Sequence, residues 1–134
     1  MKPNPRVEAR RWLSQAQSDL AFAQHGLDGR FYAHTCFMSQ EAGEKALKAL
    51  HYLGGARFVP SHSLVQLLRA LTARHPALGG LEGAAQQLDL YYVPTRYPNG
   101  LPDGIPADVF SEAQAREAVM LERRIVDSAA GLVA

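Results

Sequence analysis

Small and apolar residues recur at helical spacing from Phe31 to Leu53. One stripe repeats at intervals of four and three residues, and a second stripe beside it mixes apolar residues with Gln40, Glu44 and His51. An apolar face this wide is typical of a helix that has neighbours on more than one side. We therefore expect this segment to be the central helix of a bundle.

The segment before the central helix carries the most regular helical pattern in the sequence. Small and apolar residues repeat at the same spacing from Ala9 to Leu27. Gly26 and Gly29 lie at its end, where glycine accepts the left-handed turn that often terminates a helix. Because only a few residues connect this helix to the central one, we expect the two to be antiparallel neighbours.

Three further helices are predicted in the second half of the chain. Two Ser-x-x-Gln patterns, at 63–66 and 111–114, are typical of capping boxes at helix starts. They predict a short helix that ends before Pro76 and a last helix from about Glu112 to Leu132, which packs inward through Val119, Ile125, Ala129 and Leu132. A fourth helix is predicted from Leu81 to Tyr92, and no stretch has the alternating pattern of a strand.

These elements predict an all-α fold in one domain covering residues 1–134. We expect an up-and-down four-helix bundle with an additional short helix, five helices in all. Residues 1–5 are expected to form a flexible arm. Residues 94–109 are rich in proline and glycine, and a long loop without periodicity is often functional.

The charge balance limits the classes of partner. With 14 basic and 13 acidic side chains the formal charge is +1, so any anion site must be local. The single Cys36 excludes an internal disulfide, and the histidines show no metal-ligand spacing, so we expect no metal and no other cofactor. No apolar run is long enough to span a membrane and no secretory signal is visible, so we expect a cytoplasmic protein.

Arg96 is the strongest candidate for a functional residue. It lies in the Pro/Gly-rich loop, and its guanidinium offers five donors that match phosphate or carboxylate groups. The structural alternative is a pairing with Glu44 or with the carbonyls that end the fourth helix. For Tyr97 beside it, the alternatives are stacking on a base, accepting a modifying group, or pinning the loop onto the bundle.

Lys45 and Lys48 share one face of the central helix, and each follows an acidic residue by one turn, an order that stabilises helices. Solvated ion pairs and a phosphate-binding patch both fit this pattern. Gln40 and Glu44 lie on the half-apolar stripe, where a buried carboxylate needs a partner. With Tyr92, we expect them to give a site structural support by holding a neighbouring helix or the 94–106 loop.

His62 precedes a predicted helix start, a position that favours anions and where an imidazole can act as acid or base. The alternative is a bond to a backbone group that fixes the loop. Arg57 precedes His62 in an Arg-x4-His spacing. We interpret this spacing as coincidence, because so short a pattern often arises by chance.

Three segments together resemble the HEPN family of small helical-bundle domains. Residues 37–48, FMSQEAGEKALK, are similar to the central helix of that family, with its Gln, Glu-Lys and Lys. His62-Ser63-Leu64 is similar to its His-Asp-Leu, and residues 92–98, YVPTRYP, match its Y-x-x-T-R-Y-P run. The resemblance implies an up-and-down bundle, usually a homodimer, encoded near or fused to a minimal nucleotidyltransferase, with the HEPN protein commonly the toxin of the pair.

The chain departs from one pattern of this family. Many HEPN members are metal-independent ribonucleases that use Arg-x(4–6)-His at the start of a late helix. Arg96 has a late position, but no histidine follows it in the sequence. Other members are described as nucleotide-binding domains, a role that this departure leaves intact.

We therefore predict a HEPN-type domain that binds nucleotide or RNA phosphate through Arg96, with Tyr97, Lys45, Lys48 and His62 as helpers. It is expected to be a homodimer that acts with a separate minimal nucleotidyltransferase in a toxin–antitoxin-like module. One alternative is a metal-independent ribonuclease in which Arg96 stabilises the transition state and His62, or a residue of the second subunit, is the base. Another is a ligand-free structural or protein-interaction bundle.

Overall fold

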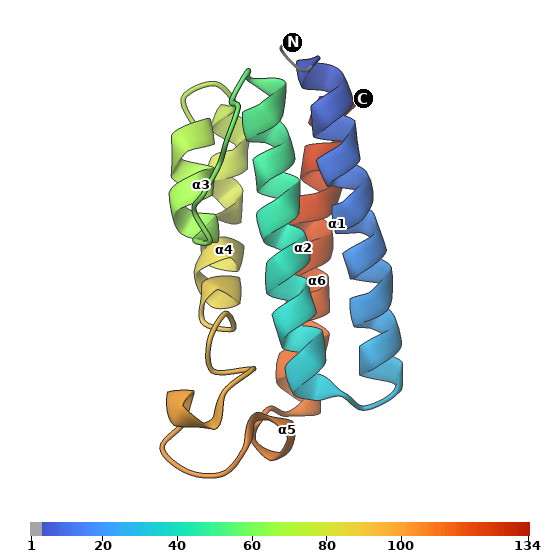
Figure 1. The fold of residues 1–134 in the computed structure, drawn as a ribbon, viewed down its shortest axis with the longest axis vertical. Helices are drawn as coiled ribbons and strands as arrows, with labels where there is room; N and C mark the ends of the chain where they lie inside the picture. Colours follow the sequence, from blue (N-terminus) through green and yellow to red (C-terminus); the bar gives the residue numbers. More distant parts are fainter. Residues whose placement is uncertain (1–3) are drawn as a thin grey trace.

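A computed structural model describes residues 4–134 and shows a bundle built around one central helix (Figure 1). Its helices are α1 (Pro5–Asp28), α2 (Tyr32–Leu53), α3 (Leu64–Leu71), the 3₁₀ helix η1 (Pro76–Leu81), α4 (Glu82–Asp89), the 3₁₀ helix η2 (Pro98–Gly100), α5 (Pro106–Val109) and α6 (Glu112–Val133). Within these residues there is no strand. The predicted all-α bundle is confirmed.

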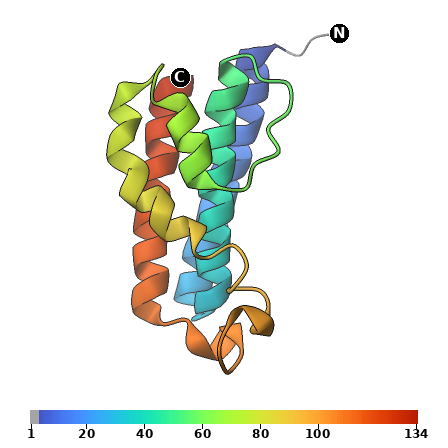
Figure 2. The same cartoon turned by 90° about the vertical axis from the view of Figure 1, so that its left-hand side faces the viewer.

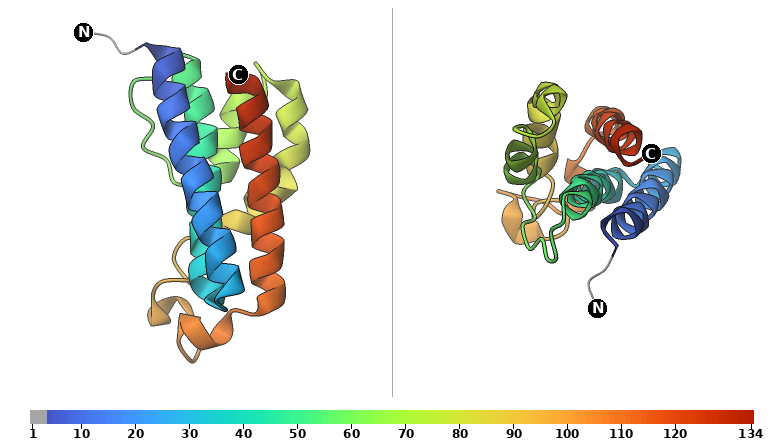
Figure 3. Two further views of the ribbon diagram at one scale, coloured as in Figure 1. Left: turned by 90° about the vertical axis from the view of Figure 1, so that its right-hand side faces the viewer. Right: turned by 90° about the horizontal axis from the view of Figure 1, so that it is seen from above.

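The helix α2 occupies the middle of the bundle. Seen from above, it lies between α1, α6 and the pair formed by α3 and α4 (Figure 3). The two short helices α3 and α4 lie side by side and antiparallel, and together they cover the remaining flank of α2 (Figure 2). The arrangement explains the two stripes of α2, because both of them face other helices.

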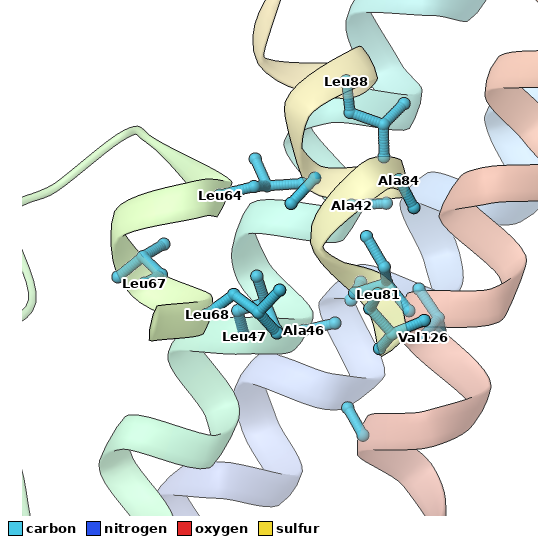
Figure 4. Packing of buried hydrophobic residues seen from close by; sticks show 14 of the residues in the cluster. Ala42, Ala46, Leu47, Leu64, Leu67, Leu68, Leu81, Ala84, Leu88 and Val126 are labelled. Carbon is cyan, nitrogen blue, oxygen red and sulfur yellow. The ribbon is translucent and has the colours of Figure 1, made fainter. Parts of the chain in front are cut away.

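Small residues on α2 let its neighbours approach closely. The leucines of α3 and α4 interlock over Ala42, Ala46 and Leu47 (Figure 4). A Cβ atom added at Gly43 would lie 2.7 Å from a methyl carbon of the buried Leu64, so Leu64 would have to shift within the packed core. The small stripe is therefore needed to seat α3 and α4 on the central helix.

Several predicted boundaries shift in the structure. The helix α4 ends at Asp89 rather than Tyr92, and Tyr91, in the turn that follows, is the buried tyrosine. Beyond Asp89 the chain continues in tighter turns, in which the N–H groups of Leu90 and Tyr91 donate to carbonyls three residues before them, and Pro94 keeps Val93 out of helical geometry. The loop predicted at 94–109 contains two short helical turns, η2 and α5.

The start and end of α1 also differ from prediction. Met1 to Pro3 of the predicted arm lie outside the described residues, but Asn4 caps the helix and Pro5 is its first residue. Proline suits that position because its missing N–H would be unpaired there in any case. At the other end Gly29 has φ −82°, and Arg30, with φ 66°, takes the left-handed turn.

Two serines cap helices as the sequence predicts, but only one completes the box. Ser111 and Gln114 make both reciprocal bonds at the start of α6. At α3 the Ser63 hydroxyl accepts from the Gln66 N–H, while the Gln66 side chain bonds Ser61 instead. The remaining α3 donors are satisfied from α4, because the Asp89 carboxylate accepts from the N–H groups of Leu64 and Val65.

None of the helices described is long and apolar enough to cross a membrane.

Candidate functional site

Arg96 lies in a cradle of three aromatic rings beside the N-terminal half of α2. Its guanidinium carbon is 4.6 Å from the ring centroids of Phe37 and Tyr92 and 5.2 Å from that of Tyr97. These distances are typical of cation–π contacts, which hold a guanidinium without using up its N–H donors. Arg96 is exposed, so the cradle presents it to solvent.

The turn after α4 places Arg96 over these rings. The Arg96 N–H donates to the Val93 carbonyl at 3.0 Å, and its Nε donates to the Tyr92 carbonyl at 2.8 Å. The buried Thr95 closes the turn through a bond from its hydroxyl to the Tyr91 carbonyl. Among residues 4–134, neither Nη group of Arg96 has a hydrogen-bond or ion-pair partner. Arg96 therefore bonds a carbonyl after the fourth helix, one of the two structural alternatives, and does not pair with Glu44.

His62 joins the same cluster from the loop before α3. Its ring stacks on Tyr92 with centroids 5.1 Å apart and planes at 17°. Its Nδ1 lies 3.2 Å from a carboxylate oxygen of Glu44, and 57% of the side chain is exposed. We call Phe37, His62, Tyr92, Arg96 and Tyr97 the Arg96 cluster.

Gln40 and Glu44 position His62. The Gln40 amide donates to the backbone carbonyl of His62 and to the Glu44 carboxylate, each at 3.1 Å. Glu44 is buried and its charge is matched by Lys48, whose Nζ lies 2.9 Å away. These side chains therefore hold the loop before α3 in place, and not the 94–106 loop that the sequence left as an option.

The two candidate lysines do not join the Arg96 cluster. Lys48 is buried beneath α1, with its ammonium 5.8 Å from the ring centroid of Trp12. Lys45 is directed between α1 and α2, where it pairs with Asp19 at 2.5 Å and with Glu41 at 3.7 Å. Both ammonium groups already neutralise buried carboxylates: Lys48 that of Glu44 one helical turn before it, and Lys45 that of Asp19 on α1.

The surroundings of Cys36 and Arg57 separate both residues from the Arg96 cluster. Cys36 is buried, and burial raises the pKa of its thiol to about 12, which leaves it unreactive. Arg57 lines a hollow with Arg11 and Tyr52 at the far end of α2, whereas His62 contacts Glu44 and Tyr92. Arg57 and His62 therefore belong to different sites.

The sequence pattern does not assign Phe37 to the site, nor does it show that Asp89, which accepts from the Ser63 hydroxyl next to His62, supports the loop before α3. Phe37 lies on the second stripe of α2 and forms one wall of the cradle. The available signal was its spacing, since Phe37, Gln40 and Glu44 follow one another at three and four residues and face the same loops. Asp89 gave no such signal, because its partners lie on a different helix.

Comparisons with known proteins agree on one family. The model of the HEPN domain matches residues 9–132. The solved structure of TT1696 from Thermus thermophilus is 39% identical, with a TM-score of 0.87, covering 92% of this chain and 97% of its own. ST0689, an archaeal HEPN homologue, is 31% identical with a TM-score of 0.78, covering 95% and 98%. An HEPN domain protein of Thermotoga maritima, tm0613, is 30% identical with a TM-score of 0.71, covering 91% and 96%. No curated protein matches the sequence significantly.

Proposed function

From the premise that this chain belongs to the HEPN family, we propose that it binds the phosphate of a nucleotide or of RNA at the Arg96 cluster. The observation that carries the proposal is an exposed guanidinium held among three aromatic rings, with both Nη groups free of partners in residues 4–134. A guanidinium binds phosphate through two parallel N–H bonds. The exposed Tyr97 ring offers a face on which a base stacks.

His62 is the second polar group of the proposed site. Its Nδ1 faces the Glu44 carboxylate, which directs Nε2 away from the bundle. Both His62 and Arg96 contact the Tyr92 ring, which makes the imidazole part of the same cluster as the guanidinium. Lys45 and Lys48, in contrast, act only through the carboxylates that they neutralise.

The proposal extends to partners on the strength of the family alone. We propose a cytoplasmic homodimer that acts with a separate minimal nucleotidyltransferase in a toxin–antitoxin-like module. Affinity purification of the tagged chain from its native cells, followed by mass spectrometry, tests this. Recovery of a nucleotidyltransferase supports the module, and its absence after chemical cross-linking contradicts it.

A metal-independent ribonuclease is the second candidate. The His62–Glu44 pair favours it, because a carboxylate on Nδ1 orients an imidazole for general-base work at Nε2. Incubation of transfer and messenger RNA with pure protein in EDTA is the test. Cleavage that Arg96→Gln and His62→Ala both abolish supports the enzyme, and intact RNA with all three proteins contradicts it.

The binding proposal is tested by titrating fluorescent ADP and a labelled RNA. Arg96→Gln removes the charge, and Arg96→Lys keeps the charge but loses the two-pronged geometry. We expect a loss of tenfold or more in affinity with Arg96→Gln, at about 1.4 kcal/mol per tenfold, and a smaller loss with Arg96→Lys. Arg123→Gln, at an exposed position of α6, is the matched control. Equal affinities for all four proteins would overturn the proposal.

A further inference from the structure

A positively charged hollow lies at the end of α2 away from the Arg96 cluster. Arg11 and Arg57 line it together with Tyr52 and Glu8. The Glu8 carboxylate is already engaged, since it accepts from Arg11 at 2.9 Å and from the Trp12 indole at 3.2 Å. Arg57 is exposed and has no hydrogen-bond or ion-pair partner within residues 4–134, so the hollow keeps one uncompensated positive charge.

A loop connects this hollow to the Arg96 cluster. Residues 54–63 descend beside α2, and the segment that carries Arg96 lies below them on the same flank (Figure 2). Phe58, next to Arg57, is the most exposed large apolar side chain described, at 78%. Further along the flank come the exposed rings of His62 and Tyr97. The loop therefore carries a cation, Arg57, and an exposed ring, Phe58, near the hollow, and the Arg96 cluster has a cation and exposed rings at the other end.

The distance between the two ends indicates an extended ligand. Tyr52 lines the hollow at Arg57, which we call the upper hollow, and Phe37 lines the Arg96 cradle. Along α2 these two residues are about four helical turns, or roughly 22 Å, apart. One nucleotide is too short to contact both. Proteins that bind single strands combine a positively charged path for the backbone with aromatic rings on which successive bases stack.

We propose that this flank binds single-stranded RNA, with phosphates at Arg57 and Arg96 and bases stacked on Phe58 and Tyr97. The inference rests on the proposed function, because it takes the Arg96 cluster as one end of the path. It adds a second anion site and a class of ligand, an unpaired strand several nucleotides long. A duplex is disfavoured because its bases are already stacked on one another and unavailable to Phe58.

Fluorescence anisotropy with two probes tests the path: a labelled oligouridine of about twelve nucleotides and fluorescent ADP. The variants are Arg57→Gln and Phe58→Ala at the upper end, Arg96→Gln at the lower end, and Arg123→Gln as the charge-matched control on α6. Both upper positions are exposed, and circular dichroism checks that each variant folds.

We expect Phe58→Ala to weaken oligouridine binding about fivefold or more. Arg57→Gln is expected to reduce the slope of log affinity against log salt by about 0.7, the value of one phosphate contact on a single strand. Neither change alters ADP binding, whereas Arg96→Gln weakens both probes. If the upper variants bind oligouridine as Arg123→Gln does while Arg96→Gln weakens both probes, the path is overturned and the proposed function stands. If the wild type binds neither probe, both are overturned.

Discussion

Two buried glutamates, Glu44 of α2 and Glu122 of α6, have opposite kinds of surroundings. Glu44, on the side of α2 that faces the loops, is in contact with Lys48, His62 and Gln40. Glu122, on α6, is fully buried and neither of its carboxylate oxygens has a hydrogen-bond partner among the described residues. One carboxylate is paired with a cation beneath a candidate site, and the other is in the core without one.

The difference affects the protonation state of Glu122. Burial, reinforced by the nearby Asp19, raises the pKa of Glu122 to about 8. The Ser39 hydroxyl is near enough to lower the pKa in part, although it does not form a hydrogen bond of ordinary geometry with the carboxylate. At pH 7 Glu122 is therefore mostly protonated and neutral. A buried carboxylate in this bundle is thus either paired with a cation or neutralised by a proton.

We expect the largest effect on stability from breaking the pair of Glu44 and Lys48. Lys48→Met keeps the apolar stem against Trp12 but leaves Glu44 buried without its cation. We expect a loss of about 3 kcal/mol in the free energy of unfolding, measured by urea titration at pH 7. The double variant Glu44→Gln/Lys48→Met should recover part of this loss. A loss below about 1 kcal/mol in Lys48→Met would show that Glu44 does not depend on its partner.

Because Glu122 has no paired cation, we expect the free energy of unfolding to depend on pH through this residue. The native state holds the Glu122 proton up to about pH 8, whereas the unfolded chain releases it near its ordinary pKa of 4.5. The contribution to stability is therefore full below pH 4.5 and is lost as pH rises towards 8. Glu122→Gln removes this dependence, so at pH 8 it should exceed the wild type by on the order of 2 kcal/mol or more. Parallel curves for the two proteins from about pH 5 to 8 would contradict the assignment.

A third carboxylate, Asp89, should have a smaller effect. It is only partly buried and accepts from backbone N–H groups at the start of α3, at 2.7 Å from Leu64 and 3.2 Å from Val65. Asp89→Asn removes the charge that favours a helix N-terminus, and we expect a loss of about 1 kcal/mol. Thermal unfolding measures it, with Asp103→Asn in an exposed loop as control. Equal losses of stability in the two variants would show that Asp89 does not stabilise the start of α3.

We expect the smallest effect from removing one ring of the Arg96 cradle, and we expect it in nucleotide affinity. Phe37→Leu keeps most of the apolar bulk but removes one ring face from Arg96. The cation–π contact is worth about 0.5–1 kcal/mol, so nucleotide affinity should fall two- to fivefold with little change in stability. Phe22→Leu, at an exposed phenylalanine of α1, is the matched control. An unchanged affinity in Phe37→Leu would show that the ring does not orient Arg96.

Periodicity predicted the fold because it reports burial directly. The middle of both α2 stripes and the inward positions Val119, Ile125 and Ala129 of α6 are buried as expected, whereas positions near the ends of the stripes are partly exposed. Glu122 lies three residues from both Val119 and Ile125, so its burial follows from the same spacing, although its charge argued against it. Leu132 is 38% exposed and Val133 is buried in its place, a shift of one residue at the helix end.

The site could be predicted only in part, because it depends on contacts between distant segments. Arg96 was a candidate from its loop and its donors, and the structure leaves it exposed and available. The ring of Phe37 and the separation of Lys45 from the cluster both depend on how α2 meets α1 and the loops. A spacing pattern within one helix gives the face of a residue and does not identify what covers that face.

The central claim is that Arg96 itself contacts phosphate, and the most direct measurement is an NMR titration of protein labelled with ¹⁵N-arginine. The Nε–Hε signal that disappears in Arg96→Gln identifies the residue. Addition of oligouridine is expected to shift the Arg96 signal while Arg123 on α6 stays unchanged. An Arg96 signal that does not move at a concentration that saturates binding would contradict the account.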